Sequence, residues 1–197
     1  MKLLKEDLIG SKEVMKSRFL TYIYQVETEA EVKAHLKALR AENPGARHIV
    51  YTYILPDLKM GASEDKEPVN SAHRILNTLK MKDVGGLVCF VVRYYGGVQL
   101  GASNLDRTYV SCVFDLLLDE YFGERITFQV YEATVSNNCM KAFEKEIISA
   151  GGKVLNKEYL GPFVKVRLGL QKEAISKLTG PYSTDLEEAK DFFSLIV

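Results

Sequence analysis

One stretch of the sequence decides the fold of its first part: Leu87-Val88-Cys89-Phe90-Val91-Val92. All six residues are apolar, and most are β-branched or aromatic. They lack the alternation of polar and apolar residues that marks a strand with one wet face. The run therefore predicts a central β-strand covered on both faces. Gly85-Gly86 precedes it and Gly96-Gly97 follows it, so we expect a turn at each end.

Upstream of this strand, the apolar periodicity alternates between strand and helix. A helix should begin at Thr28, because Glu31 lies three residues later and completes a capping box. The sequence Asn43-Pro44-Gly45 should end it. The other expected elements are a strand within residues 14–25, a strand over 48–55, a polar loop over 56–66 and a helix from Pro68 to about Lys80.

Downstream, a helix is expected from about Ala102 to Tyr121, and Gly123 is interpreted as its stop and as a domain boundary. The expected elements beyond it are a strand over 126–135, a helix to Ala150, a hairpin of 154–159 and 163–170, a short helix over 171–178 and a last strand over 192–197. The order β-α-β-β-α-β predicts a ferredoxin-like unit. The sequence thus predicts an α+β protein with domains 1–123 and 124–197.

Composition narrows the class of protein. The chain has 197 residues, a hydrophobic fraction of 47% and equal numbers of basic and acidic residues, 26 of each. A globular protein is expected, without the overall basic surplus of many nucleic-acid binders, although a local basic patch remains open. Cys89, Cys112 and Cys139 lack metal-ligand spacing and predict buried free thiols. With no long apolar run and no signal-peptide core, we expect a soluble cytosolic protein, with no membrane partner.

The segment after the central strand carries a family signature. It runs from Arg93 to Tyr109 as RYYGGVQLGASNLDRTY and closely resembles the signature of the YigZ/IMPACT family. Three shorter pieces agree with it: Ser17-Arg18-Phe19, His48 at the start of the second expected strand, and Asp65-Lys66-Glu67-Pro68, which resembles an acidic turn of the family. Together these pieces cover the N-terminal two-thirds of the chain.

The resemblance implies a first domain related to the second domain of ribosomal small-subunit protein five. It implies a second domain like the ferredoxin-type domains of elongation factor G. Family members are linked to translational control, and no reaction is firmly attached to the family. The chain departs from the family pattern at four glycine positions, where it carries Asn70, His73, Ser103 and Asn104. If those glycines let a ligand approach the backbone, the side chains present here would obstruct it.

The glycine-rich segment is a candidate anion site. Gly96, Gly97 and Gly101 precede an expected helix N-terminus, whose free N–H groups and dipole can hold a phosphate. Arg93 and Arg107 flank the turn, and we expect their side chains to lie on one surface beside it. One alternative is that the glycines form only a tight strand-to-helix connection that needs positive φ. Another is that either arginine pairs internally with Glu67 or Asp65 and only holds the acidic loop in place. The segment matches neither of the common phosphate-binding glycine motifs.

The acidic loop contains Glu64, Asp65 and Glu67. Paired carboxylates can bind a metal ion or perform acid–base chemistry, and they also decorate exposed loops. Because no second carboxylate cluster is visible, we expect no metal site and no cofactor. His48 is interpreted as structural, and His73 is close enough in sequence to pair with the loop.

The sequence is compatible with three functions. The first is a non-catalytic binding factor associated with translation, whose partner is the ribosome, RNA or a translation-control protein. The second is a hydrolase or phosphotransfer enzyme that uses the glycine turn and the acidic loop. The third is a protein-interaction scaffold. The sequence specifies neither the partner nor the oligomeric state, and fold analogy alone does not decide between the three.

Overall fold

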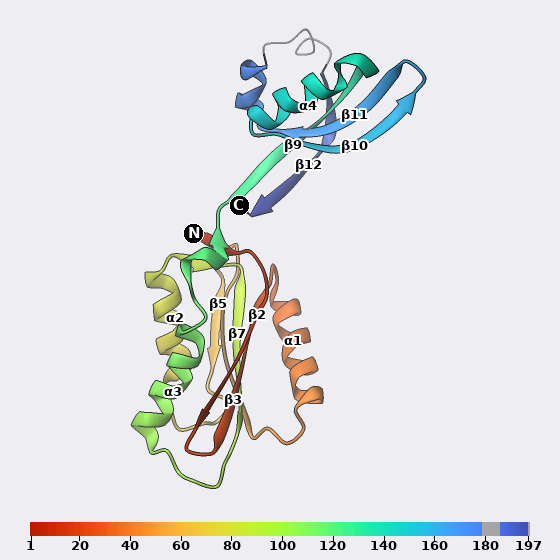
Figure 1. The fold of residues 1–197 in the computed structure, drawn as a ribbon. Coiled ribbons are helices and arrows are strands. Elements are labelled where there is room, and N and C mark those ends of the chain that lie inside the picture. Colours follow the sequence, from red (N-terminus) through yellow and green to blue (C-terminus); the bar gives the residue numbers. More distant parts are fainter. Residues whose placement is uncertain (179–185, 197) are drawn as a thin grey trace. The chain divides into compact units, whose positions relative to one another are not determined.

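The computed structural model of the chain describes residues 1–178 and 186–196. They form two compact units, one of residues 1–124 with Ile196 and one of the described residues between 125 and 195 (Figure 1). Both units combine β-sheet with helices, so the predicted α+β class is confirmed.

The first unit is built on a five-stranded sheet in which all neighbouring strands are antiparallel. In spatial order the strands are β2 (Leu8–Val14), β3 (Ser17–Gln25), β7 (Leu87–Tyr94), β4 (His48–Ile54) and β5 (Met60–Ser63). The strand β7 is central, with Ile23 of β3 opposite Cys89 and Val50 of β4 opposite Val91.

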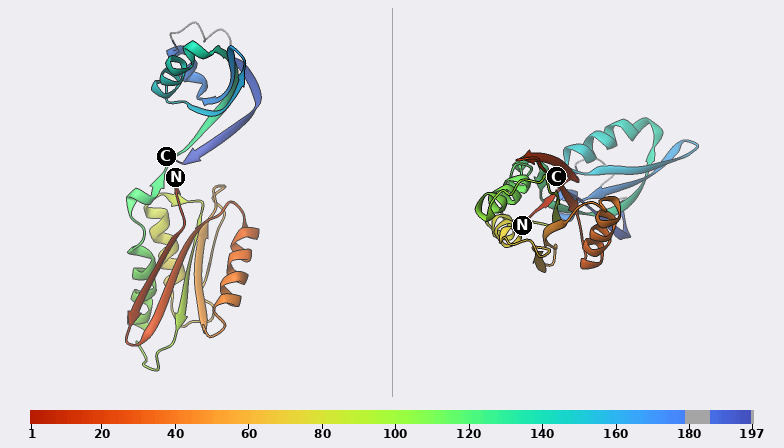
Figure 2. Two further views of the ribbon diagram at one scale, coloured as in Figure 1. Left: turned by 45° about the vertical axis from the view of Figure 1, so that its right-hand side comes forward. Right: turned by 90° about the horizontal axis from the view of Figure 1, so that it is seen from below.

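Helices cover both faces of this sheet. The helix α1 (Glu29–Glu42) lies on one face, and α2 (Ser71–Met81) and α3 (Ala102–Phe114) lie on the other (Figures 1 and 2). Successive residues of β7 serve the two layers in turn: Val88, Phe90 and Val92 pack with α1, whereas Leu87, Cys89 and Val91 pack with α2 and α3. All six are buried. The predicted central strand is confirmed, and its lack of alternation follows from having an apolar layer on each side.

Several shorter elements differ from the expectation. The region 14–25 is the second half of a hairpin, because Met15 and Lys16 form a turn with positive φ and β2 precedes them. The expected loop 56–66 contains the edge strand β5. The helix expected to reach Tyr121 ends at Phe114. Hydrogen-bonded turns follow Phe114, and Leu117 within them is still buried. The apolar periodicity therefore continues beyond the end of the helix.

A small three-stranded sheet completes the first unit. It pairs β6 (Val84–Gly85), β1 (Lys2–Leu4) and β8 (Phe122–Gly123), the last of which follows a short 3₁₀ helix, η1 (Asp119–Tyr121). The sequence did not predict β1. The helix α2 begins at Ser71 and not at Pro68. In the described part of the chain, no helix is both long enough and apolar enough to span a bilayer.

The second unit has a separate four-stranded sheet in the order β10-β11-β9-β12. These strands are β10 (Lys153–Leu160), β11 (Phe163–Leu170), β9 (Arg125–Ser136) and β12 (Glu187–Ile196). A short 3₁₀ helix, η2 (Asn137–Cys139), leads into α4 (Met140–Ser149), which covers one face. The first and third strands of the unit are central, which is the ferredoxin-like arrangement.

Two expectations for the second unit need correction. The short helix over 171–178 is a 3₁₀ helix, η3 (Lys172–Lys177). The last strand starts at Glu187, five residues before the expected start at Phe192, and its expected end at Val197 lies outside the described residues. The hairpin of 154–159 and 163–170 is present, with Leu160 paired to Phe163 at its turn.

Candidate functional site

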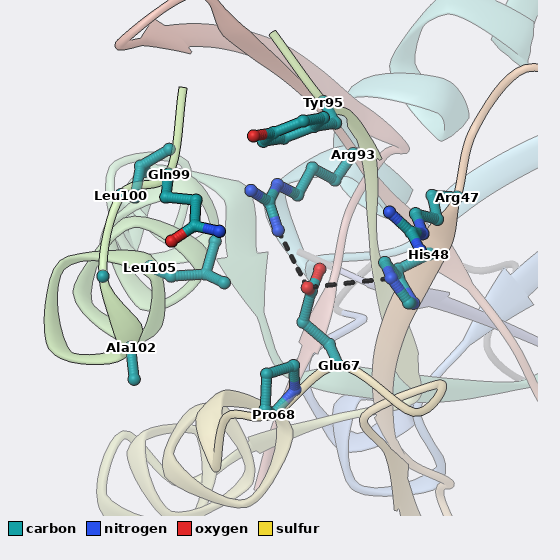
Figure 3. Close-up of a pocket in the computed structure, with 11 residues that line it drawn as sticks. Arg47, His48, Glu67, Pro68, Arg93, Tyr95, Gln99, Leu100, Ala102 and Leu105 are labelled. Atoms are coloured by element: carbon teal, nitrogen blue, oxygen red, sulfur yellow. Dashed lines mark hydrogen bonds and ion pairs between the residues drawn. The ribbon is translucent and has the colours of Figure 1, made fainter. Parts of the chain in front are cut away.

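The first unit contains a cavity of about 380 Å³ at the C-terminal end of β7 (Figure 3). This volume lies at the small end of the range of about 300–1,000 Å³ that is usual for small-molecule sites. Its lining residues are Arg47, His48, Glu67, Pro68, Arg93, Tyr95, Gln99, Leu100, Gly101, Ala102 and Leu105.

Strand pairing brings the polar wall of the cavity together. His48, the first residue of β4, lies opposite Arg93 near the end of β7. The backbone N–H of Arg47 donates to the carbonyl oxygen of Arg93 at 3.3 Å, which fixes the entry to β4. Glu67 comes from the turn between β5 and α2. The opposite wall is formed by the start of α3 and the loop before it.

A buried ion pair forms the floor of the cavity. Arg93 and Glu67 are each 7% exposed, and Nη1 of Arg93 donates to Oε1 of Glu67 at 2.8 Å. The hydroxyl of Tyr109 donates to Oε2 at 2.6 Å, and Nε2 of His48 lies 3.7 Å from Oε1. Burial and the neighbouring Glu67 carboxylate raise the pKa of Tyr109 far above its ordinary value, so its phenol stays a donor. Both carboxylate oxygens are thus occupied.

Arg93 keeps an unused donor. Its Nε is buried and has no hydrogen-bond partner among the described residues. The guanidinium lies 5.9 Å from the ring centre of Phe19 and 5.6 Å from that of Tyr95, distances typical of cation–π contacts. In Figure 3 it lies beneath the Tyr95 ring and points toward Gln99 and Glu67. A buried donor without a partner costs about 1–3 kcal/mol.

The N-terminus of α3 forms part of the same cavity. Gly101 is its N-cap, with φ +75°, and provides no side-chain cap. The first backbone N–H groups of a helix have no partner within the helix, and the helix dipole makes this end favourable for anions. Gly101 and Ala102 both line the cavity. The helix end and the Arg93 guanidinium therefore border one space.

The two preceding glycines shape the turn and do not line the cavity as described. A Cβ on Gly96 would lie 2.0 Å from the backbone of Lys16, so glycine is required by the close approach of the β2–β3 turn. The N–H of Gly96 donates to Oγ of Ser17 at 3.2 Å. Gly97 has φ +82°, a conformation that favours glycine.

Most of the acidic loop is used for structure. A side-chain oxygen of Asp65 accepts the N–H of Ile49 at 2.6 Å and pairs with Arg40. Glu64 accepts the N–H of Ala72 at 2.8 Å, which caps α2, and lies 3.6 Å from His73. Among the described residues, no group of three or more His, Cys, Asp or Glu side chains is arranged to hold a metal ion.

Only some of the candidate residues named from the sequence therefore line the cavity. Arg93, Glu67 and Gly101 line one cavity, whereas Gly96, Gly97, Asp65 and Arg107 do not belong to its described lining. Arg107 is exposed on α3. The four residues that replace family glycines, Asn70, His73, Ser103 and Asn104, are also outside the described lining, so they do not obstruct this cavity.

Sequence reasoning missed three contributors. Arg47 was not singled out, His48 was interpreted as structural, and Tyr109 was named only as the last residue of the family signature. Tyr109 reaches Glu67 across the fold, and no local pattern signals that contact. The His48 position was visible only as part of the family resemblance.

Comparison with known proteins places the chain in a family. Residues 15–117 match the Impact N-terminal domain. The matched range is more than half of the chain and includes every residue in the described lining of the cavity. A curated relative from Haemophilus influenzae (strain ATCC 51907 / DSM 11121 / KW20 / Rd), an IMPACT family member, is 30% identical over 189 residues. That match covers 89% of this chain and 91% of the relative. The chain belongs to the IMPACT family.

Two further similarities cover nearly the whole length. The IMPACT family member YigZ of Escherichia coli (strain K12) is 29% identical over 173 residues, 85% of this chain and 84% of YigZ. A solved crystal structure, described as that of a hypothetical protein, is 26% identical and aligns with a TM-score of 0.60. It covers 100% of this chain and 96% of the solved chain.

Proposed function

We propose that this chain is a non-catalytic, cytosolic binding factor associated with translation, and that its first unit binds a phosphate group of RNA in the cavity beside Arg93. The observation that carries the proposal is the buried Arg93 guanidinium, whose Nε has no partner in the described structure and which borders the N-terminus of α3. Membership of the IMPACT family supports the translational setting, because the family resemblance implies a link to translational control.

The local charge suits an anion although the whole chain is neutral. Glu67 is already matched by Arg93, and Arg47 adds a positive charge at the exposed edge of the cavity. Arg47 makes no ion pair within the described residues. A phosphate oxygen can accept hydrogen bonds from the α3 backbone and from a guanidinium at once, and charge-assisted bonds of this kind are strong.

The same geometry argues against acid–base or nucleophilic catalysis. Each carboxylate oxygen of Glu67 accepts one hydrogen bond, from Arg93 or from Tyr109, and the side chain is one half of a buried ion pair, an arrangement that does not suit a general base. Burial raises the pKa of Cys112 to about 11 and that of Cys89 further, so neither thiol is activated as a nucleophile. These features favour a binding factor over the hydrolase or phosphotransfer alternative.

Co-sedimentation with ribosomes across a salt series tests the proposal. Wild-type protein should sediment with ribosomes at low salt and dissociate as salt rises, because phosphate contacts release counterions. Arg47→Ala should weaken binding and reduce the slope of log K against log salt by about one unit. Arg107→Ala is the matched control, since it removes the same charge from an exposed residue outside the described lining of the cavity.

Three results would count against the proposal. If neither ribosomes nor isolated RNA bind the wild type, the protein has another class of partner. If binding is independent of salt, phosphate is not the group recognised. If Arg107→Ala weakens binding as much as Arg47→Ala does, the contact surface is the outside of α3 and not the cavity.

A further inference from the structure

We propose that the cavity takes a terminal phosphate of an RNA chain, a phosphomonoester, and not an internal phosphodiester. This inference rests on the function proposed above and specifies its ligand. It is drawn from the number of donors that meet in the cavity and from the apolar residues that surround them.

Several donors border the same cavity. They are the backbone of Gly101 and Ala102 at the start of α3, the Arg93 guanidinium and the exposed Arg47 side chain. A phosphomonoester offers three terminal oxygens and a charge near −2 at neutral pH. An internal phosphodiester offers two such oxygens and one charge. The monoester therefore uses the donors that line the cavity more fully.

The rest of the lining is unsuited to a second phosphate. Pro68, Leu100 and Leu105 present apolar side chains beside the start of α3, and the floor carries the Glu67 carboxylate (Figure 3). Burying a charge against an apolar wall without a partner is costly, and a carboxylate repels it. Across the described lining, the ionised side chains are those of Arg47, Arg93 and Glu67. Because Glu67 offsets the charge of Arg93, the Arg47 charge and the N-terminus of α3 remain to attract an anion, which suits one phosphate and not a phosphate chain.

Tyr95 provides the neighbouring recognition element. Its ring covers the Arg93 guanidinium at 5.6 Å and is 46% exposed, so one aromatic face is available beside the phosphate position. Bases stack on such faces without strong sequence preference. A terminal nucleotide presents one phosphate and one base, and its chain leads away from the cavity. We expect a nucleotide end to place its base against Tyr95.

Fluorescence anisotropy with short single-stranded RNAs tests this directly. Three RNAs of one sequence carry a 5′-phosphate, a 3′-phosphate or hydroxyls at both ends, each with an internal fluorophore. One phosphorylated RNA should bind about tenfold or more tightly than the hydroxyl RNA, and the preferred end identifies the source of the phosphate. The matching nucleoside monophosphate should compete. Arg47→Ala and Tyr95→Ala should reduce this preference, whereas Arg107→Ala should retain it.

The outcomes separate this inference from the proposed function. If all three RNAs bind equally well and Arg47→Ala weakens each of them, RNA binding stands and the terminal-phosphate inference is overturned. If no RNA binds the wild type, the proposed function and the inference both fail. If the terminal preference persists unchanged in Arg47→Ala and Tyr95→Ala, it arises outside this cavity and the inference is overturned.

Discussion

The two main sheets of this chain differ in how many of their faces are covered by helices. In the first unit, helices cover both faces, and the central strand β7 is apolar from Leu87 to Val92. In the second unit, one face packs on α4 and the strand β11 alternates, with Val164 and Val166 buried while Lys165 between them is exposed. The difference shows that the residue pattern of a strand reports how many of its faces are covered.

The same contrast applies to charged residues. The Glu67 and Arg93 side chains of the first unit are 5% and 8% exposed. Glu132 pairs with Lys165 on the open face of the second unit, where the side chains are 30% and 44% exposed, and also lies 3.4 Å from Arg167. Breaking a buried pair leaves an unpaired charge inside the protein, whereas water solvates the remaining partner of an exposed pair. Removing one partner of an ion pair should therefore lower the free energy of unfolding more in the first unit than in the second.

The largest expected loss of stability comes from placing a charge in β7, the strand that has helices over both faces. Val91→Asp should lower the free energy of unfolding by at least about 4 kcal/mol, because a carboxylate there would be buried without a partner. Urea unfolding measured by circular dichroism gives the value. Thr134→Asp is the control: Thr134 is exposed on β9 opposite Lys165, and the change should stay within about 0.5 kcal/mol. Equal losses for the two variants would remove the distinction between the sheets.

A smaller loss is expected when the buried ion pair is broken. Glu67→Ala leaves Arg93 and the Tyr109 hydroxyl without their carboxylate, so the free energy of unfolding should fall by about 3–5 kcal/mol. Labelling of the buried Cys89 and Cys112 thiols during urea titration reports the first unit specifically. An unchanged midpoint for thiol exposure would show that this pair does not stabilise the first unit.

The smallest effect is expected for the exposed counterpart. Glu132→Ala removes the same side chain from the open face of the second unit and should lower the free energy of unfolding by less than about 1 kcal/mol. The loss should shrink further in 1 M salt, where the screening length is about 3 Å. A salt-independent loss as large as that of Glu67→Ala would contradict the comparison between the two environments.

Elements marked by a local sequence pattern were predicted, whereas elements that depend on pairing with distant residues were not. The central strand and the ferredoxin-like order were predictable, because apolar runs and periodicity are local properties. The short strands β1 and β5 were missed, since their stability comes from pairing and not from their own composition. The β2–β3 turn was also missed, because Met15 and Lys16 adopt positive φ without the glycine or asparagine that usually marks such a turn.

For the candidate site, the sequence identified residues but not their arrangement. Arg93 and Glu67 were both singled out, and their pairing was one of the alternatives. The expected convergence of Arg93 with Arg107 was not reproduced in the described cavity, which has Arg47 as its second arginine. Arg47 reaches the site through β4 pairing with β7. Contacts of this kind depend on tertiary structure and leave no trace in a local pattern.

The central claim is that the Arg93 guanidinium and the first turn of α3 together hold one phosphate. Two-dimensional ¹H–¹⁵N NMR during titration with a 5′-phosphorylated and a 3′-phosphorylated dinucleotide tests it most directly, because the Arg93 Nε–H and the backbone N–H groups of Gly101 and Ala102, which line the cavity, each give a separate signal. The account predicts that one dinucleotide shifts these signals together and saturably. Saturable shifts confined to other residues, or no shifts with either dinucleotide, would contradict it.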